Sequence, residues 1–257
     1  MTDFIPTPER QKQILSLVAK QGRLRVAEIV EQFSISEATA RRDLESLASE
    51  GKVQRVHGGA VAVEQAPPEL PILERENEQA DEKSRIGRAT AELIADKEAV
   101  FLGSGTTVLE VARNLRDRKN LTVITNSLPV LNMLAGVKEI TVVSLGGILR
   151  DSELSFIGHI TEQALGELRA DKVIIGARAV SLEQGLTNDY LHETLTDRAI
   201  LKIGREVILV ADHSKINRVS TTFLAPLTDV HKLVTDKQTP RAFIAALKAQ
   251  GINSIVV

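Results

Sequence analysis

The stretch Gly103-Ser104-Gly105-Thr106-Thr107 has the composition of an anion-binding turn. It follows the apolar run Ala99–Leu102 and precedes a helical stripe of apolar residues, so a strand should lead into it and a helix should start from it. Free backbone N–H groups and the helix dipole favour an anion there. The Walker lysine is absent, and Val108 stands where a dinucleotide fingerprint needs its third glycine. The turn is therefore predicted to hold a phosphate or carboxylate; a glycine-rich turn without a ligand is the alternative.

Small, hydroxyl or charged residues also follow other strand-like runs of the chain. The C-terminal ends of parallel strands form one crevice, so these residues are expected to surround a small polyhydroxylated anion. Lys215 or Arg178 would balance its charge, and Asp212 or Asn126 would bind its hydroxyl groups. The predicted effector-binding residues are Gly103, Ser104, Gly105, Thr106, Thr107, Asn126, Ser127, Gly146, Gly147, Arg178, Glu193, Asp212, Ser214 and Lys215.

Seven apolar runs alternate with helical patterns over residues 80–257, which predicts an α/β domain with a mainly parallel sheet covered on both faces. The expected strands are Ala99–Leu102, Leu121–Thr125, Ile140–Leu145, Lys172–Ile175, Glu206–Ala211, Lys232–Thr235 and Ile252–Val257. Before this domain, residues 64–79 are rich in proline and glutamate. Proline fixes φ and removes a donor, so this segment, named here the connector, is expected to be stiff and solvated.

Residues 1–63 have the pattern of a small helical domain. Helical spacing and turn residues predict helices over 8–21, 26–33 and 37–50 and strands over 52–56 and 60–63. Ser36 is a favourable N-cap for the third helix. A turn at His57-Gly58-Gly59 joins the two strands. Three helices followed by a hairpin with basic residues describe a winged helix-turn-helix.

The third helix is expected to enter a DNA major groove, while the hairpin contacts phosphates and the minor groove. The alternative is a protein-binding helical domain in which Arg41 and Arg42 form a solvated face. The small residues Ala38 and Thr39 beside these arginines favour DNA. The predicted DNA-binding residues are Ser36, Ala38, Thr39, Arg41, Arg42, Lys52, Arg55, His57, Gly58 and Gly59.

The composition excludes several other classes of protein. The 257 residues contain no cysteine, which excludes disulfides, thiolate metal sites and a cysteine nucleophile. No apolar run is long enough to span a membrane, and the N-terminus is not that of a signal peptide, so a cytoplasmic protein is expected. One tyrosine and no tryptophan disfavour single-strand binding by stacking. No metal, cofactor or catalytic residue is predicted.

The DNA-binding motif resembles that of DeoR-type repressors. The likeness extends from Ile35 to Leu44 and includes Arg55-Val56-His57-Gly58-Gly59-Ala60. The residues that carry it in the second domain are Gly103–Thr107, Thr125-Asn126-Ser127, Gly146-Gly147, Gly185-Leu186-Thr187, Glu193 and Asp212-His213-Ser214-Lys215. The resemblance implies an effector domain similar to ribose phosphate isomerase and coenzyme A transferase folds. It also implies a homo-oligomeric regulator, dimer or tetramer, of a carbohydrate operon that binds double-stranded operator DNA and senses a phosphorylated sugar or related metabolite.

Two positions depart from the pattern that many relatives carry. Arg178-Ala179 replace an Asp-Gly pair, and Asp197-Arg198 replace Lys-Arg. Arg178 either engages a second phosphate or carboxylate, because guanidinium binds such groups bidentately, or it pairs with Asp197 on the surface and binds nothing.

An isomerase-like enzyme with an appended DNA-binding domain is the competing hypothesis. Sugar isomerisation needs a base and a group that stabilises the enediolate, roles open to Asp212, Lys215 and Glu193. A fold does not carry chemistry with it, and the attached DNA-binding domain favours sensing. An architectural DNA-bound protein without a ligand is disfavoured by the polar strand ends.

Overall fold

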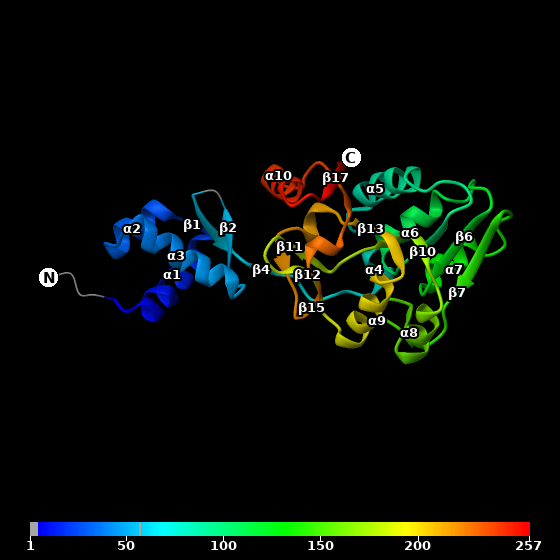
Figure 1. Cartoon of the computed structure of the whole chain (residues 1–257), viewed down its shortest axis with the longest axis horizontal. Helices are drawn as coiled ribbons and strands as arrows, with labels where there is room; N and C mark the ends of the chain where they lie inside the picture. Colours follow the sequence, from blue (N-terminus) through cyan, green and yellow to red (C-terminus); the bar gives the residue numbers. More distant parts are fainter. Residues whose placement is uncertain (1–4, 57) are drawn as a thin grey trace.

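The computed structural model describes residues 5–56 and 58–257, arranged as two domains joined by the connector (Figure 1). His57, expected in the turn of the hairpin, lies outside the described residues. Among the described residues, no helix combines the length and apolar character needed to cross a bilayer.

The N-terminal domain is a winged helix-turn-helix, as expected from the sequence. Its core contains Ile14, Ile29 and Leu44, one from each helix, packed against the hairpin. The Oγ atom of the N-cap Ser36 accepts a hydrogen bond of 3.1 Å from the backbone N–H of Thr39. A strand that the sequence pattern missed, Arg23–Arg25, completes a three-stranded antiparallel sheet. The elements are α1 (Thr7–Gln21), β1 (Arg23–Arg25), α2 (Val26–Phe33), α3 (Glu37–Ser49), β2 (Val53–Val56) and β3 (Gly59–Ala62).

The C-terminal domain is built on a seven-stranded sheet in the order β17-β16-β13-β10-β5-β6-β7, with parallel pairing throughout. The expected parallel sheet is thereby confirmed. The strands are β5 (Ala99–Leu102), β6 (Leu121–Thr125), β7 (Ile140–Ser144), β10 (Ala170–Ile175), β13 (Gly204–Val210), β16 (Lys232–Thr235) and β17 (Asn253–Val256).

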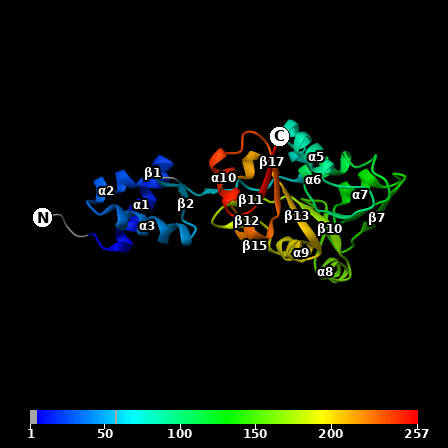
Figure 2. The same ribbon diagram turned by 45° about the horizontal axis from the view of Figure 1, so that its top comes forward.

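Helices cover both faces of this sheet (Figures 1 and 2). Successive side chains of a strand point to opposite faces, so Phe101 joins one apolar cluster, and Val100 and Leu102 join the other. The cluster with Phe101 includes residues of α8, α9 and α10; the other includes residues of α5, α6 and α7. The helices are α5 (Ala80–Glu92), α6 (Thr106–Arg113), α7 (Leu128–Leu134), α8 (His159–Gly166), α9 (Leu191–Leu201) and α10 (Arg241–Ala249).

Short strands outside the main sheet were not expected from the sequence. They form the antiparallel sheet β11-β12-β15 and the pairs β8–β9 and β4–β14. Their bounds are β4 (Glu64–Gln65), β8 (Ile148–Arg150), β9 (Ser155–Ile157), β11 (Ala179–Ser181), β12 (Gly185–Asn188), β14 (Arg218–Val219) and β15 (Thr222–Ala225).

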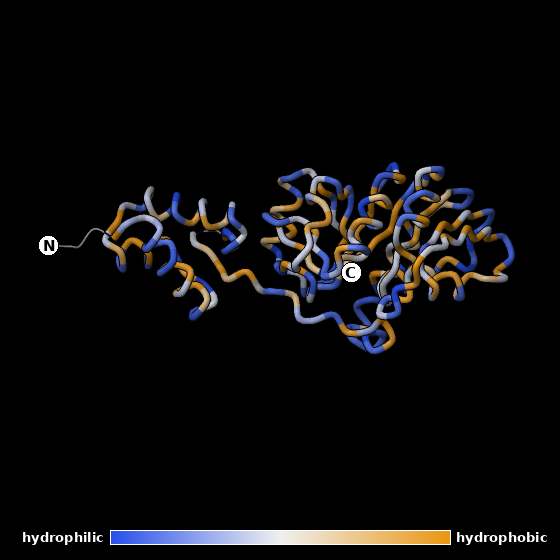
Figure 3. The backbone as a smooth tube through the Cα atoms, turned by 90° about the horizontal axis from the view of Figure 1, so that it is seen from below, coloured by the Kyte–Doolittle hydropathy of each residue, from blue (hydrophilic) through white to orange (hydrophobic). Residues whose placement is uncertain are grey.

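The connector is not the fully solvated spacer that its composition suggested. Figure 3 shows it as a single, mostly hydrophilic chain that follows the hydrophobic β3 and runs onto the C-terminal domain. Its strand β4 pairs with β14, and a short helix, α4 (Ile72–Arg75), buries Ile72. Apolar burial at one position and pairing at another hold it against the larger domain.

Candidate functional site

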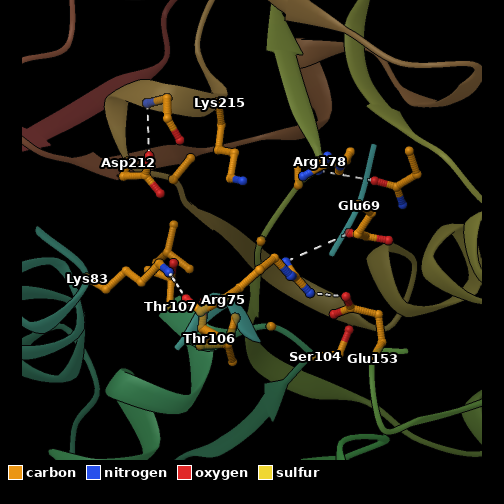
Figure 4. Close-up of a pocket in the computed structure, with 18 of the residues that line it drawn as sticks. Glu69, Arg75, Lys83, Ser104, Thr106, Thr107, Glu153, Arg178, Asp212 and Lys215 are labelled. Atoms are coloured by element: carbon orange, nitrogen blue, oxygen red, sulfur yellow. Dashed lines mark hydrogen bonds and ion pairs between the residues drawn. The ribbon is translucent and has the colours of Figure 1, made fainter. Parts of the chain in front are cut away.

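A pocket lies at the C-terminal ends of β5, β10 and β13 (Figure 4). The chain runs outward from β5 to β6 and β7. It then returns to the other side of β5, where it forms β10 and β13. Ligands of open parallel sheets bind where the strand order reverses in this way. The segments after the three strands, Ser104–Val108, Gly176–Arg178 and Ala211–Asp212, all line the pocket.

One end of the pocket is suited to an anion. The N-terminus of α6 points into it, and Gly105, its N-cap, has φ 105° and ψ 152°, a conformation that only glycine adopts readily. Thr106 and Thr107 lie near Lys83, and Ser104 lines the pocket closer to Glu153 (Figure 4). Lys83 from α5 and Lys215 add two ammonium groups. Burial lowers the pKa of both lysines, although the carboxylate of Asp212 opposes this shift. Burial removes hydrating water from these ammonium groups, and a bound anion would compensate for that loss.

Asp212 is buried at this end, and one of its two oxygen atoms is unpartnered. Oδ1 accepts a hydrogen bond of 2.9 Å from the backbone N–H of Ser214. Oδ2 has no hydrogen-bond partner among the described residues. Buried polar atoms are normally satisfied, so Oδ2 is available to a hydroxyl group of a ligand.

The opposite end of the pocket is rich in carboxylates. Glu153 pairs with Arg75, and Glu193 pairs with Arg150. Burial raises the pKa of Glu153 and of Glu193 to about 8, against the attraction of these arginines. Asp197 accepts a hydrogen bond of 2.8 Å from Asn188 Nδ2, and burial raises its pKa to about 7. Carboxyl groups of this kind suit the hydroxyl groups of a polyol.

We expect the replacement Asp197→Asn to flatten the dependence of stability on pH. The folded state favours the neutral form of Asp197, so its contribution is fully present below the ordinary pKa near 4 and is lost as pH rises through about 7. Melting temperatures measured from about pH 5 to about pH 8 should therefore fall less in this variant than in the wild type. The exposed Asp117→Asn is the matched control. Equal slopes in Asp197→Asn and the wild type would contradict the assignment.

Arg178 lines the pocket but does not form the surface pair that was one of the two expectations. Its Nε donates to Asp189 Oδ2 at 2.9 Å, and Nη2 donates to the backbone carbonyl of Pro67. It does not pair with Asp197, whose partner is Asn188. The expected surface pair is therefore wrong, and the guanidinium group links the pocket to the connector.

Five of the expected effector residues do not line the pocket. Asn126 Nδ2 donates to the carbonyl of Phe156, and Ser127 is the N-cap of α7. β6 and β7 lie one and two strands away from β5, on the side opposite β10, which places their ends beyond the pocket. The residues concerned are Gly103, Asn126, Ser127, Gly146 and Gly147.

The expected residues that do line the pocket are Ser104, Gly105, Thr106, Thr107, Arg178, Glu193, Asp212, Ser214 and Lys215. Sequence reasoning missed Glu69, Arg75, Lys83, Glu153, Asn188, Asp189 and Asp197. None of these follows a strand of the main sheet directly. The sequence did contain a signal for one of these residues. Lys83 is a cation on the inward face of an amphipathic helix, next to Ile86 and Gly87.

Five of the ten expected DNA-binding residues lie in α3 or at its N-cap. Ala38, Arg41 and Arg42 are exposed near its start. Arg41 pairs with Glu37 one turn earlier. The side chain of Arg42 has no ion pair or hydrogen bond among the described residues, so it is free for a partner.

The hairpin β2–β3 contributes cations beside α3. Arg55 Nη1 donates to the carbonyl of Arg41 at 3.1 Å, and Lys52 pairs with Glu50 at the surface. Gly58 is exposed, with φ 79°. Gly59 differs from the expectation of a DNA contact, because it is buried and a Cβ atom would lie 2.2 Å from the carbonyl oxygen of Leu24. Glycine is required at this position because the backbone of β1 lies too close for a side chain.

Both domains match known families. Residues 10–66 match the family described as "DeoR-like helix-turn-helix domain", and residues 78–237 match "DeoR C terminal sensor domain". The connector residues 67–77 fall between the two matched ranges.

Two curated proteins are similar over nearly the whole chain. The "Transcriptional repressor AccR" of Agrobacterium fabrum is 37% identical over 92% of this chain and 92% of its own. The "Glycerol-3-phosphate regulon repressor" of Escherichia coli is 35% identical over 95% of this chain and 97% of its own. Among solved structures, ribose 5-phosphate isomerase A of Methanocaldococcus jannaschii aligns with 54% of this chain and 55% of its own, at 21% identity and a TM-score of 0.39.

Proposed function

The chain belongs to the DeoR family of transcriptional regulators, and we propose that it represses an operon of carbohydrate metabolism until a small phosphorylated sugar or related metabolite releases it. One observation carries this proposal: a DNA-binding domain is joined to a second domain whose pocket has cations at one end and carboxyl groups at the other. The relatives are named as repressors, which favours a regulator over an isomerase-like enzyme.

In this proposal the phosphate lies at the N-terminus of α6, between Lys83 and Lys215. Backbone N–H groups and the two ammonium groups would neutralise it. Hydroxyl groups of the ligand would extend toward Asp212 Oδ2 and the carboxyl groups of Glu193 and Asp197. The effector must prefer the conformation that binds DNA poorly, because a ligand with equal affinity for both conformations changes nothing.

We further propose that the protein acts in the cytoplasm as a homo-oligomer on paired half-sites. One recognition helix and one wing make few contacts for operator specificity. The C-terminal domain exposes apolar side chains on adjoining elements: Leu191 is 54% exposed and Leu195 is 43% exposed on α9, and Phe223 is 50% exposed on β15. Arg198 of α9 bonds the carbonyl of Leu224, so these two elements lie side by side. Such a surface suits a second copy of the chain.

A thermal-shift screen tests the proposed ligand class. Glycerol 3-phosphate, ribose 5-phosphate, glucose 6-phosphate and inorganic phosphate are compared with the unphosphorylated polyol and sugars. A compound present at about 100 times its Kd adds about 2.7 kcal/mol to the free energy of unfolding, which raises the melting temperature measurably. The phosphorylated compounds are expected to stabilise the protein without being converted. Turnover of any of them would favour the enzyme hypothesis, and stabilisation by the unphosphorylated forms alone would contradict the phosphate site.

A further inference from the structure

The connector is docked on the sensor domain at two places. In the parallel pair β4–β14, Gln65 is opposite Val219, and the backbone N–H of Ala66 donates to the carbonyl of Val219 at 2.9 Å. Further along, the backbone N–H of Ile72 donates to the carbonyl of Ser152 at 2.7 Å. Between these two places Glu69 of the connector lines the pocket.

Polar groups of the connector take part in the pocket's network of charges. The Glu69 carboxylate accepts a hydrogen bond of 2.8 Å from Arg150 Nη2, and its other oxygen lies 3.8 Å from Arg75 Nη1. Arg178 binds the carbonyl of Pro67. In Figure 4, Glu69 and Glu153 lie on one side of the pocket, and Lys83, Thr106, Thr107 and Asp212 lie on the other. Arg75 extends between them: its carbonyl accepts a hydrogen bond from Lys83, and its guanidinium group pairs with Glu153. Arg75 is 9% exposed, and its Nε has no partner among the described residues.

The same part of the sensor domain also contacts the DNA-binding domain. Gln54 Nε2 donates to Asn217 Oδ1 at 2.7 Å. Asn217 lies two residues after Lys215 and immediately before β14. One short segment, residues 212–219, therefore lines the pocket, supports the DNA-binding domain and pairs with the connector.

The connector is the side of the pocket that is attached least firmly to the rest of the domain. The pocket has a cavity of about 80 Å³, bordered on one side by Glu69 and Arg75 of the connector. The strands and α6 are fixed in the packed core, which resists displacement. The connector is held only by a short ladder, by ion pairs and by one buried side chain, Ile72, so it is the side that can yield.

We propose that connector residues 67–75 form the movable wall of the effector site, and that Glu69 holds this wall closed. The inference rests on the proposed function and deepens it. A sugar phosphate that enters the site displaces Glu69 from Arg150 and Arg75, which then donate to the ligand. The connector separates from β14, and the DNA-binding domain loses its fixed position. Closed and open positions of the wall then have different affinities for the operator, as release requires.

The replacement Glu69→Gln tests the proposal on the full-length protein without any ligand. Removing this charge should loosen the wall, so hydrogen exchange in residues 64–75 is expected to accelerate by about tenfold. Operator affinity should fall by about tenfold, because the open state becomes more populated. Glu74→Gln is the matched control, since Glu74 is an exposed carboxylate in the same segment. It should leave exchange and affinity unchanged.

A reversible cross-link separates movement of the connector from other effects of Glu69→Gln. The chain has no cysteine, so the added pair Q65C/V219C can form only one intramolecular disulfide. In the Glu69→Gln background, the oxidised protein should recover operator affinity and slow exchange, and the reduced protein should lose both again.

Two results would overturn the proposal. One is wild-type operator affinity and exchange in Glu69→Gln; the other is reduced affinity that the oxidised cross-link does not restore. If Glu69→Gln does not fold, Arg178→Gln removes the bond to Pro67 at the other end of the wall and carries the same expectations. These measurements use no effector. They can therefore contradict the movable wall whatever the outcome of the ligand screen.

Discussion

Replacing Gly105 with aspartate is expected to abolish the response to phosphorylated sugars while operator binding persists. The N-terminus of α6 would then carry a carboxylate where the anion is proposed to bind. A Cβ atom at Gly105 meets no heavy atom within 4 Å, so the added side chain finds space in the pocket. The stabilisation of about 2.7 kcal/mol expected at 100 times Kd should disappear. Thermal shifts and operator titrations with ribose 5-phosphate, glycerol 3-phosphate and glucose 6-phosphate measure the effect.

Gly105→Ala is the necessary control for this variant. Any side chain at φ 105° is strained, at a cost on the order of 1–3 kcal/mol, so alanine and aspartate should lower the melting temperature similarly. Only aspartate adds charge, and only aspartate should remove the ligand response completely. If Gly105→Asp folds and still leaves the operator at the wild-type ligand concentration, this turn is not the anion site.

Replacing Arg42 with alanine is expected to weaken specific operator binding by about 1–3 kcal/mol, or roughly 5- to 150-fold, and to relax the choice of sequence. The reason is its position: Arg42 is exposed near the start of α3, and its side chain is unpaired among the described residues. Arg41, by contrast, is already paired with Glu37. Binding to operator variants, measured at constant salt, gives both the affinity and the specificity.

The matched control is Arg205→Ala on the sensor domain. This removes the same charge from a side chain that is 86% exposed, far along the chain from α3. Its operator affinity should stay within about twofold of the wild type, since remote surface charges contribute little. Equal losses in Arg42→Ala and Arg205→Ala would indicate a general electrostatic effect and would contradict a base-reading role for Arg42.

The sequence was sufficient to predict the main sheet because its inner strands are largely buried. The run Ala99–Leu102 is continuous in apolar residues, and the bounds of the predicted strands agree with the structure within about two residues, the usual uncertainty of element ends. The strands of β11-β12-β15 are short and contain residues such as Gly185 and Asn188. Their pairing depends on tertiary contacts, which local patterns do not express.

The candidate site was predictable where it follows strands and unpredictable where it does not. Strand ends indicated Gly105 and Lys215 correctly as residues of one pocket. The same rule wrongly included Asn126, because the order of strands in the sheet is invisible in the chain. Glu69 and Arg75 were missed because a proline-rich composition indicates a spacer, whereas one buried side chain, Ile72, anchors the segment.

The pairing of β4 with β14 also determines where this protein can be divided. An experimenter who exchanges the DNA-binding domain for that of a relative, to retarget the regulator or to build a biosensor, must choose a junction. A junction after residue 77, between the two matched family ranges, would replace Glu69 and Arg75 with foreign residues. A junction between Val63 and Glu64 keeps β4 and the whole connector with the sensor. The segment that must stay together to keep the ligand response is therefore longer than the sensor domain defined by sequence families.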